Sequence, residues 1–321
     1  MDNNCIIQEQ ITQEIDKKTV KKTFSRIGWS LCTMFLLSFF IPAILAFVLT
    51  LFTEVDLLAS GEMTILISFV PMYLIAVPAC LLMLKKLPAE APEPKPLGAK
   101  SFFILLLIFF AVTYTGNVIG TLLSALLSNG NAENVVMDTI VGGGVLAHIF
   151  ATIVAPIAEE YIFRKQIIDR TRKYGETTAA FFSAITFGLF HANLFQFFYA
   201  FAVGWLLAYI YIRTGRLRYV ISVHVLINFF GSVVSSILLE NMEISTEALT
   251  AGTVMTLVYS LFVITVWISG IVLAAASVNK LVWKKSEYEL ARGERVKYPY
   301  FNSGMIAFTV LCLVMIAFYL I

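Results

Sequence analysis

The segment VGGGVLAHIFATIVAPIAEEYIFR, residues 141–164, decides how this chain folds. Most of it is apolar, and it is long enough to cross a bilayer as a helix, because about 20 apolar residues span the hydrocarbon. It ends on Glu159, Glu160 and Arg164. Ionisable side chains in lipid cost about 2–4 kcal/mol each or more unless they are partnered. Such groups mark a functional site by default, so we expect a membrane helix that carries chemistry.

Pro156 lies one turn before the two acids. A proline lacks the backbone N–H that would continue the helix and it crowds the carbonyl of Thr152, so we expect the helix to bend or open there. Glu160 and Arg164 are four residues apart and share one face, whereas Glu159 points about 100° away. The sequence therefore predicts an ion pair between Glu160 and Arg164 and a second acid, Glu159, that is free to exchange protons.

The composition extends this interpretation to the whole chain of 321 residues. It is 59% hydrophobic and 14% charged, with a mean hydropathy of +0.84, which excludes an ordinary soluble domain. The net charge of +2 gives no reason to expect a nucleic acid. We expect membrane lipids around an all-α, polytopic transmembrane helix bundle of about nine helices. The apolar runs place them at 28–52, 63–84, 101–127, 140–163, twice within 177–213, and at 219–239, 251–279 and 303–321.

The basic residues predict the orientation of the bundle. All 23 Lys and Arg residues fall in segments 1–27, 85–100, 164–173, 213–218 and 280–297. These alternate with loops that carry none, and cytoplasmic loops hold the excess of basic residues. We therefore predict a cytoplasmic N-terminus and a C-terminus outside.

The chain divides into four parts by composition. We expect a cytoplasmic N-terminal segment (1–27), two peripheral transmembrane helices with a Pro-rich linker (28–96), a catalytic helix bundle (97–239), and C-terminal transmembrane helices with a basic cytoplasmic loop (240–321). The four cysteines, Cys5, Cys32, Cys80 and Cys312, have no metal or redox spacing and are expected to pack as apolar residues.

The three histidines all lie in apolar runs. His148 is expected to pack or hydrogen-bond rather than act as a ligand. His191 follows Phe187 by four residues, and His224 precedes Asn228 by four, so each pair shares a helix face. Two such histidines together with two glutamates, each on a different helix, are better explained by a converging site than by separate core residues.

For the acids to meet His191, both must lie at the same depth in the membrane. If the helix ended at Arg164, the acids would lie too near the surface to meet His191, so we expect it to continue through Arg170 to Lys173. The site is then expected to open toward the cytoplasm, with His224 nearer the rim.

In this order, the motifs resemble the CAAX prenyl protease and bacteriocin-processing (CPBP, or Abi) family of intramembrane proteases. The family pattern is EExxxR, then FxxxH, then HxxxN. It is matched here by Glu159-Glu160-Tyr-Ile-Phe-Arg164, Phe187-Gly-Leu-Phe-His191 and His224-Val-Leu-Ile-Asn228. The resemblance covers roughly residues 101–239, and no motif position departs from the pattern.

The resemblance implies an intramembrane endopeptidase. Glu159 would activate water with His191, while His224 and Asn228 would stabilise the oxyanion. Glu160 and Arg164 would shape the catalytic cavity, and Phe187 would contact the substrate. The implied substrate is a membrane-associated peptide or protein, for example a prenylated protein or a secreted-peptide precursor. The resemblance also implies that the protein lies in a bacterial plasma membrane.

Several alternatives stay open. Two histidines and a glutamate are also a catalytic zinc ligand set, but Arg164 disfavours a dication there, so we expect no cofactor and keep zinc as the alternative. Buried carboxylates, histidines and an arginine also occur in proton-coupled transporters, although we find no internal repeat. A non-catalytic immunity or scaffold protein is a third possibility. Glu159 and Glu160 could also be interfacial residues that reach toward headgroups.

Overall fold

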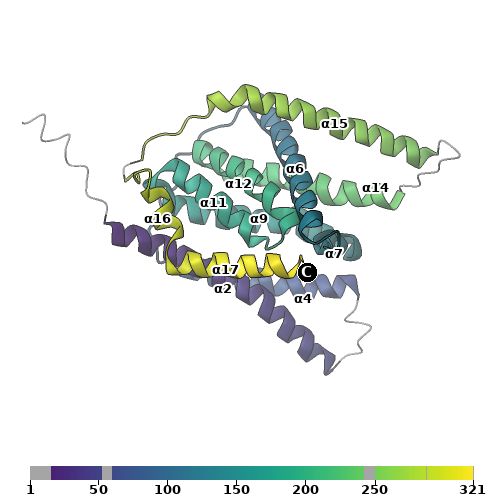
Figure 1. The fold of residues 1–321 in the computed structure, drawn as a ribbon, viewed down its shortest axis with the longest axis horizontal. Helices are drawn as coiled ribbons and strands as arrows, with labels where there is room; N and C mark the ends of the chain where they lie inside the picture. The colour runs from purple at the N-terminus through teal and green to yellow at the C-terminus, as the bar shows by residue number, and fades with distance from the viewer. Residues whose placement is uncertain (1–15, 53–59, 242–249, 287, 321) are drawn as a thin grey trace, which may run out of the picture.

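The computed structural model describes residues 16–52, 60–241, 250–286 and 288–320. Over these residues the chain is helical and contains no strand (Figure 1). Short π- or 3-10 segments, labelled η, interrupt several α-helices. The elements are α2 (Lys17–Thr50), α4 (Gly61–Pro71), η1 (Met72–Ala76), α5 (Val77–Leu84), α6 (Ala99–Leu127), α7 (Val135–Gly142), α8 (Gly144–Ile149), η2 (Phe150–Val154), α9 (Ala155–Glu159), η3 (Glu160–Ile168), α10 (Asp169–Thr171), η4 (Arg172–Tyr174), α11 (Glu176–Phe190), α12 (Leu194–Thr214), α13 (Leu217–Asn228), η5 (Phe229–Val234), α14 (Ser235–Asn241), α15 (Ala251–Ser277), η6 (Val278–Lys280), α16 (Glu294–Tyr300) and α17 (Ser303–Phe318).

This is a multi-pass membrane protein. Among the described residues, seven helices are long and apolar enough to cross a bilayer, and α16 with α17 forms an eighth candidate that is bent by 75°. Every predicted span corresponds to a helix, so the all-α polytopic bundle is confirmed, with seven or eight candidate spans among the described residues against the about nine that we expected. The difference is α11, whose 15 residues extend about 22 Å, less than the thickness of the hydrocarbon.

The basic segments gather at one end of the bundle. The Pro-rich linker crosses this end, where Glu90 N donates to the carbonyl of Asp169 and Lys95 N donates to the carbonyl of Thr214, each at 2.7 Å. These two bonds tie the linker to the ends of α10 and α12.

The N-terminal helix and the loop after α15 meet at the same end. Lys17 forms an ion pair with Glu294 at 3.2 Å, and Leu290 N donates to the carbonyl of Tyr174 at 3.1 Å. The structure therefore agrees with the prediction that all five basic segments share one side. Which side faces the cytoplasm stays a prediction.

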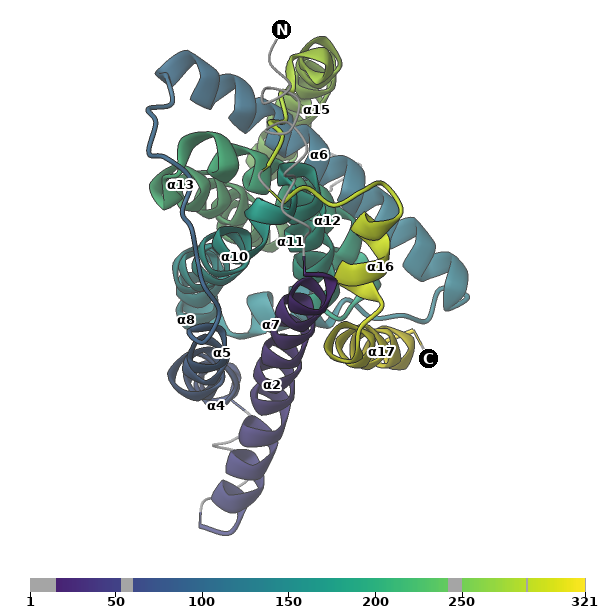
Figure 2. The ribbon, with the colours of Figure 1, turned by 90° about the vertical axis from the view of Figure 1, so that its left-hand side faces the viewer.

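The two ends of the chain pack together through helices α2 and α17 (Figure 2). A Cβ added to Gly28 would lie 2.3 Å from the carbonyl carbon of Gly304. Only a residue without a side chain permits so close a crossing, and small residues are typical of packed membrane helices.

The first helix shares a core with the helices that carry the motifs. The rings of Phe24 and Phe182 lie 4.8 Å apart, and those of Phe35 and Phe190 lie 5.8 Å apart. We expected the helices of residues 28–96 at the periphery, but α2 packs directly on α11. The division of the chain into four parts stays a prediction.

Three of the cysteines fit the predicted packing role. Cys32, Cys80 and Cys312 are free and buried. Cys5 lies outside the described residues.

Candidate active site

The helix that carries both acids is continuous from Gly144 to Tyr174. The predicted extension through Arg170 to Lys173 is therefore confirmed. Arg164 lies well before the end of this helix, and its side chain is fully buried.

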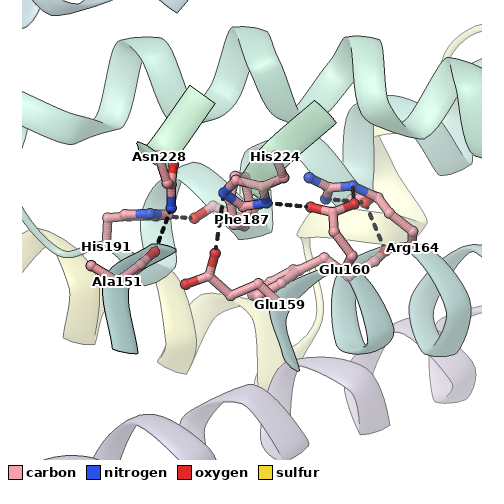
Figure 3. A network of polar contacts seen from close by, with 10 residues as sticks. Ala151, Glu159, Glu160, Arg164, Phe187, His191, His224 and Asn228 are labelled. Carbon is pink, nitrogen blue, oxygen red and sulfur yellow. Dashed lines mark hydrogen bonds and ion pairs between the residues drawn. The ribbon is translucent and has the colours of Figure 1, made fainter. Parts of the chain in front are cut away.

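Pro156 opens the helix one turn before the acids, as predicted. In η2 the N–H of Ala155 donates to the carbonyl of Phe150, five residues earlier. In this π register the carbonyl of Ala151 would accept from residue 156, which is a proline and has no N–H. Asn228 supplies the missing donor, because its Nδ2 lies 2.8 Å from the Ala151 oxygen (Figure 3). The proline thus creates an acceptor that ties α13 to the site helix.

The predicted ion pair between Glu160 and Arg164 is confirmed. Arg164 Nε lies 3.0 Å from Glu160 Oε2, and both side chains are wholly inaccessible. Arg164 Nη1 also donates to Ser183 Oγ at 3.2 Å, and its guanidinium lies over the ring of Phe187, 4.6 Å from the centroid. These contacts fix both ions within the bundle.

His224 joins the two acids. Its Nδ1 lies 2.9 Å from Glu160 Oε1, and its Nε2 lies 3.7 Å from Glu159 Oε2. An ionised Glu160 can only accept, so Nδ1 carries the proton of this bond. The Nε2 atom faces Glu159, for which this contact is the ion pair seen among the described residues.

His224 does not lie nearer the rim, contrary to our expectation. Its Nδ1 lies 2.9 Å from Glu160 Oε1, and the two side chains are only 7% and 0% exposed. The two side chains therefore lie at the same depth.

His191 stands at the end of α11 with its ring held by its own helix. Nδ1 lies 2.8 Å from the carbonyl oxygen of Phe187. A carbonyl only accepts, so Nδ1 carries the hydrogen and Nε2 is free. The following Ala192 has a left-handed φ of 53°, and Asn193 caps α12 by accepting from Gln196 N. This tight turn fixes where the imidazole stands.

Glu159 contacts His224 and is drawn near His191 (Figure 3). In Figure 3 the imidazoles of His191 and His224 stand on either side of the Glu159 carboxylate. The structure thus brings together all of the residues that the motifs singled out.

Phe187 packs inside the network of motif residues. Its side chain is 2% exposed and is enclosed by Phe163, His191 and His224, with ring centroids 5.1, 4.8 and 5.9 Å away. The guanidinium of Arg164 covers its face. These contacts position the motif side chains, and the expected contact of Phe187 with substrate stays a prediction.

The motifs missed three residues beside this network. Ser183 accepts from Arg164 and donates to the carbonyl of Phe163 at 2.8 Å, and its position four residues before Phe187 could have revealed it. The ring of Tyr199 lies 6.5 Å from that of His191, and the ring of Tyr73 stacks on Phe150 of η2 at 5.9 Å, each distance between ring centroids. Within the described part of the chain, the buried Tyr73 hydroxyl has no hydrogen-bond partner. No local pattern indicated either tyrosine.

His148 has the packing role that we expected. Its Nδ1 lies 3.4 Å from Ser232 Oγ, and this hydroxyl also contacts Thr152 Oγ1 at 3.1 Å. These contacts join α8 and η2 to η5, away from the two acids.

The residues as placed do not fit a catalytic zinc ion. Across the described ranges, no group of three or more His, Cys, Asp or Glu side chains is arranged to hold a metal. Glu160 is engaged by Arg164 and His224, and the buried guanidinium adds a fixed positive charge. We therefore derive no step through a metal.

Comparisons with known proteins agree with the motifs. Residues 141–230, which include every motif position, match the family described as type II CAAX prenyl endopeptidase Rce1-like. The chain is also 28% identical over 186 residues to a Bacillus subtilis (strain 168) protein named "Putative membrane peptidase YdiL", which covers 56% of this chain and 73% of that protein. No solved structure matches. These findings confirm the resemblance: the chain is similar to the CPBP family of intramembrane proteases, and the matches indicate a CAAX-type membrane protease.

Proposed function

We propose that this protein is a glutamate-dependent intramembrane endopeptidase that hydrolyses a peptide bond of a membrane-associated peptide or protein. The observation that carries the proposal is the unequal use of the two acids. Glu160 is held by Arg164 at 3.0 Å and by His224 Nδ1 at 2.9 Å, whereas Glu159 has, among the described residues, one longer ion-pair contact, with His224 Nε2 at 3.7 Å. One carboxylate is structural, and its neighbour is available for proton transfer.

In the proposed reaction Glu159 accepts a proton from a water molecule as the water oxygen attacks the scissile carbonyl carbon. The free Nε2 of His191 accepts a hydrogen bond from the same water and orients it. The tetrahedral intermediate then collapses, the C–N bond breaks, and the proton held by Glu159 passes to the leaving amine. The new carboxyl group therefore receives its added oxygen from water.

His224 and Asn228 are proposed to stabilise the oxyanion. Each already donates one hydrogen within the protein, to Glu160 and to Ala151 respectively. The remaining donors are the second amide hydrogen of Asn228 and Nε2–H of His224 when its ring is protonated. One such donor is worth about 10²–10³ in rate in well-studied hydrolases.

The direct test is Glu159→Gln in liposomes that contain a membrane-embedded peptide substrate. We expect cleavage to fall by about 10³ or more while thermal unfolding is unchanged, because a neutral amide cannot accept the proton. Glu93→Gln, at a linker position whose side chain is 85% exposed, is the matched control and should cleave as the parent does. Full cleavage by Glu159→Gln would refute the proposal.

The same vesicles separate the alternatives. A proton-coupled transporter would show a proton flux that Glu159→Gln alters, measured with an entrapped pH-sensitive dye. A scaffold or immunity protein would show neither cleavage nor flux.

We further infer a bacterial plasma membrane, an N-terminus in the cytoplasm and a C-terminus outside. The gathering of the basic segments at one end supports this orientation. A C-terminal alkaline phosphatase fusion should be active, since that enzyme folds only outside the cytoplasm. Candidate substrates are prenylated proteins and secreted-peptide precursors. Mass spectrometry of peptides that accumulate in cells carrying Glu159→Gln should identify the class.

A further inference from the structure

A cavity of about 290 Å³ adjoins the candidate active site at the turn between α11 and α12. Its floor is the turn that carries His191, so this imidazole borders both the catalytic groups and the cavity. The cavity also reaches Glu133 and Asn134, in the loop before α7. The cavity therefore lies at the C-terminal end of α11, far from Lys173. We had expected the site to open at the opposite end, toward the cytoplasm.

Part of the wall comes from helices that the family match does not include. Phe35 and Phe39 of α2 form one side, and Phe69 of α4 with Met72 forms another. These residues precede the matched segment 141–230. The rings of Phe35 and Phe39 touch at 4.9 Å, and Phe35 also packs on Phe190 beside His191. The N-terminal helices thus complete a pocket that the motif helices alone leave open.

The chemistry of the lining favours an apolar occupant. Seven of the fourteen lining residues are Phe, Tyr or Met, and they include both rings of α2 and the ring of Phe69. The polar groups among them are partly used within the chain, since Ser38 Oγ donates to the carbonyl of Phe35 and Asn193 Nδ2 donates to the carbonyl of His191 and to Gln196. A polar group placed here would lose its water with little in return.

The size of the cavity limits the occupant further. An apolar cavity of about 150 Å³ holds one benzene molecule. A space of about 290 Å³ therefore accommodates one large side chain such as Leu, Met or Phe, and it is too small to enclose a long isoprenoid chain.

We propose that this cavity binds one large apolar side chain of the peptide substrate, next to the bond that Glu159 and His191 cleave, and that Phe39 and Ser38 limit its size. The inference rests on the proposed function. A peptide whose scissile carbonyl lies against His191 brings the side chain of a flanking residue to the mouth of the cavity.

The test uses membrane-embedded peptides that are identical except for Ala, Leu, Phe or Trp on either side of the cleaved bond. For the parent protein we expect kcat/KM for Leu or Phe to exceed that for Ala by about tenfold or more at one of the two positions, as for other hydrophobic pockets. Ser38→Phe should fill the cavity, removing this preference while cleavage of the Ala peptide persists. Phe39→Ala should enlarge it and raise the relative rate of the Trp peptide. Phe40→Ala is the matched control, because Phe40 is the next residue of α2, is 61% exposed and does not line the cavity.

The outcomes separate the two proposals. If the parent cleaves and Ser38→Phe and Phe39→Ala leave the order of substrates unchanged, the pocket assignment is wrong and the protease stands. If the parent protein cleaves none of the peptides, the proposed function fails. A second measurement needs no turnover: a peptide carrying a diazirine analogue of leucine at the preferred position, or scanned along its apolar stretch, is photolysed with Glu159→Gln. Crosslinks to residues 35–39 or 68–72 support the pocket, and crosslinks confined to other helices overturn it.

Discussion

Replacing Arg164 with methionine tests the buried charge network most sharply. Methionine keeps much of the apolar volume but removes the ion pair with Glu160, the hydrogen bond to Ser183 and the contact with the face of Phe187. Glu160 is then left with His224 as its remaining polar partner.

The expected loss is large because both ions are inaccessible to water. Removing one partner of a buried ion pair costs about 3–5 kcal/mol, mainly because the other charge stays buried without compensation. The double variant Glu160→Gln/Arg164→Met has no such charge, so it should be less destabilised than Arg164→Met alone. That reversal cannot arise if the two side chains act independently.

Unfolding in mixed micelles, with increasing mole fraction of sodium dodecyl sulfate, measures the free energy of unfolding of each variant. Arg295→Met is the control, because Arg295 also pairs with a glutamate, Glu289, at 2.7 Å, but with side chains 40% and 27% exposed. It should lose less than about 1 kcal/mol. A loss below 1 kcal/mol for Arg164→Met, or a double variant less stable than Arg164→Met, would refute the reasoning.

Three further predictions concern the proline, the amide and the metal. Asn228→Leu leaves the Ala151 carbonyl without its donor and should lower the free energy of unfolding by about 1–3 kcal/mol and kcat by about 10²–10³. Pro156→Ala restores an N–H for that carbonyl, so adding it to Asn228→Leu should recover stability in the same micelle assay but not kcat; recovery of both would show that Asn228 acts only as a structural tie. Dialysis against a zinc chelator should leave peptide cleavage unchanged, and a loss that added zinc restores would show a metal mechanism.

Contacts within one helix could be predicted from the sequence. The spacing of Glu160 and Arg164 sets an ion pair because residues four apart face the same way, and the structure has that pair. Pro156 predicted an opened turn, since a missing N–H has the same consequence in any helix.

Contacts between helices could not be predicted in this way. Spacing along a helix says nothing of how far one helix is shifted along its axis against the next. Here α13 is placed so that His224 Nδ1 lies 2.9 Å from Glu160 Oε1. From the sequence we expected His224 near the rim, because its depth was counted only from Arg218.

The sequence also did not predict that the N-terminal helices line a cavity beside the site. Phe35, Phe39 and Phe69 lie in uniformly apolar runs, which lack the periodicity that distinguishes a lipid-facing side from a packed one. Only the packed structure shows that these rings enclose a cavity beside His191.

The central claim is that Glu159 activates a water molecule for direct attack on the peptide bond. A single turnover in H₂¹⁸O, with enzyme in excess over peptide, tests it by mass spectrometry of the new C-terminus. We predict one ¹⁸O atom in the product carboxyl group of the parent protein and no product from Glu159→Gln. A first-turnover product that holds only ¹⁶O would show that an enzyme carboxylate attacks the carbonyl itself, and undiminished cleavage by Glu159→Gln would remove Glu159 from the chemistry.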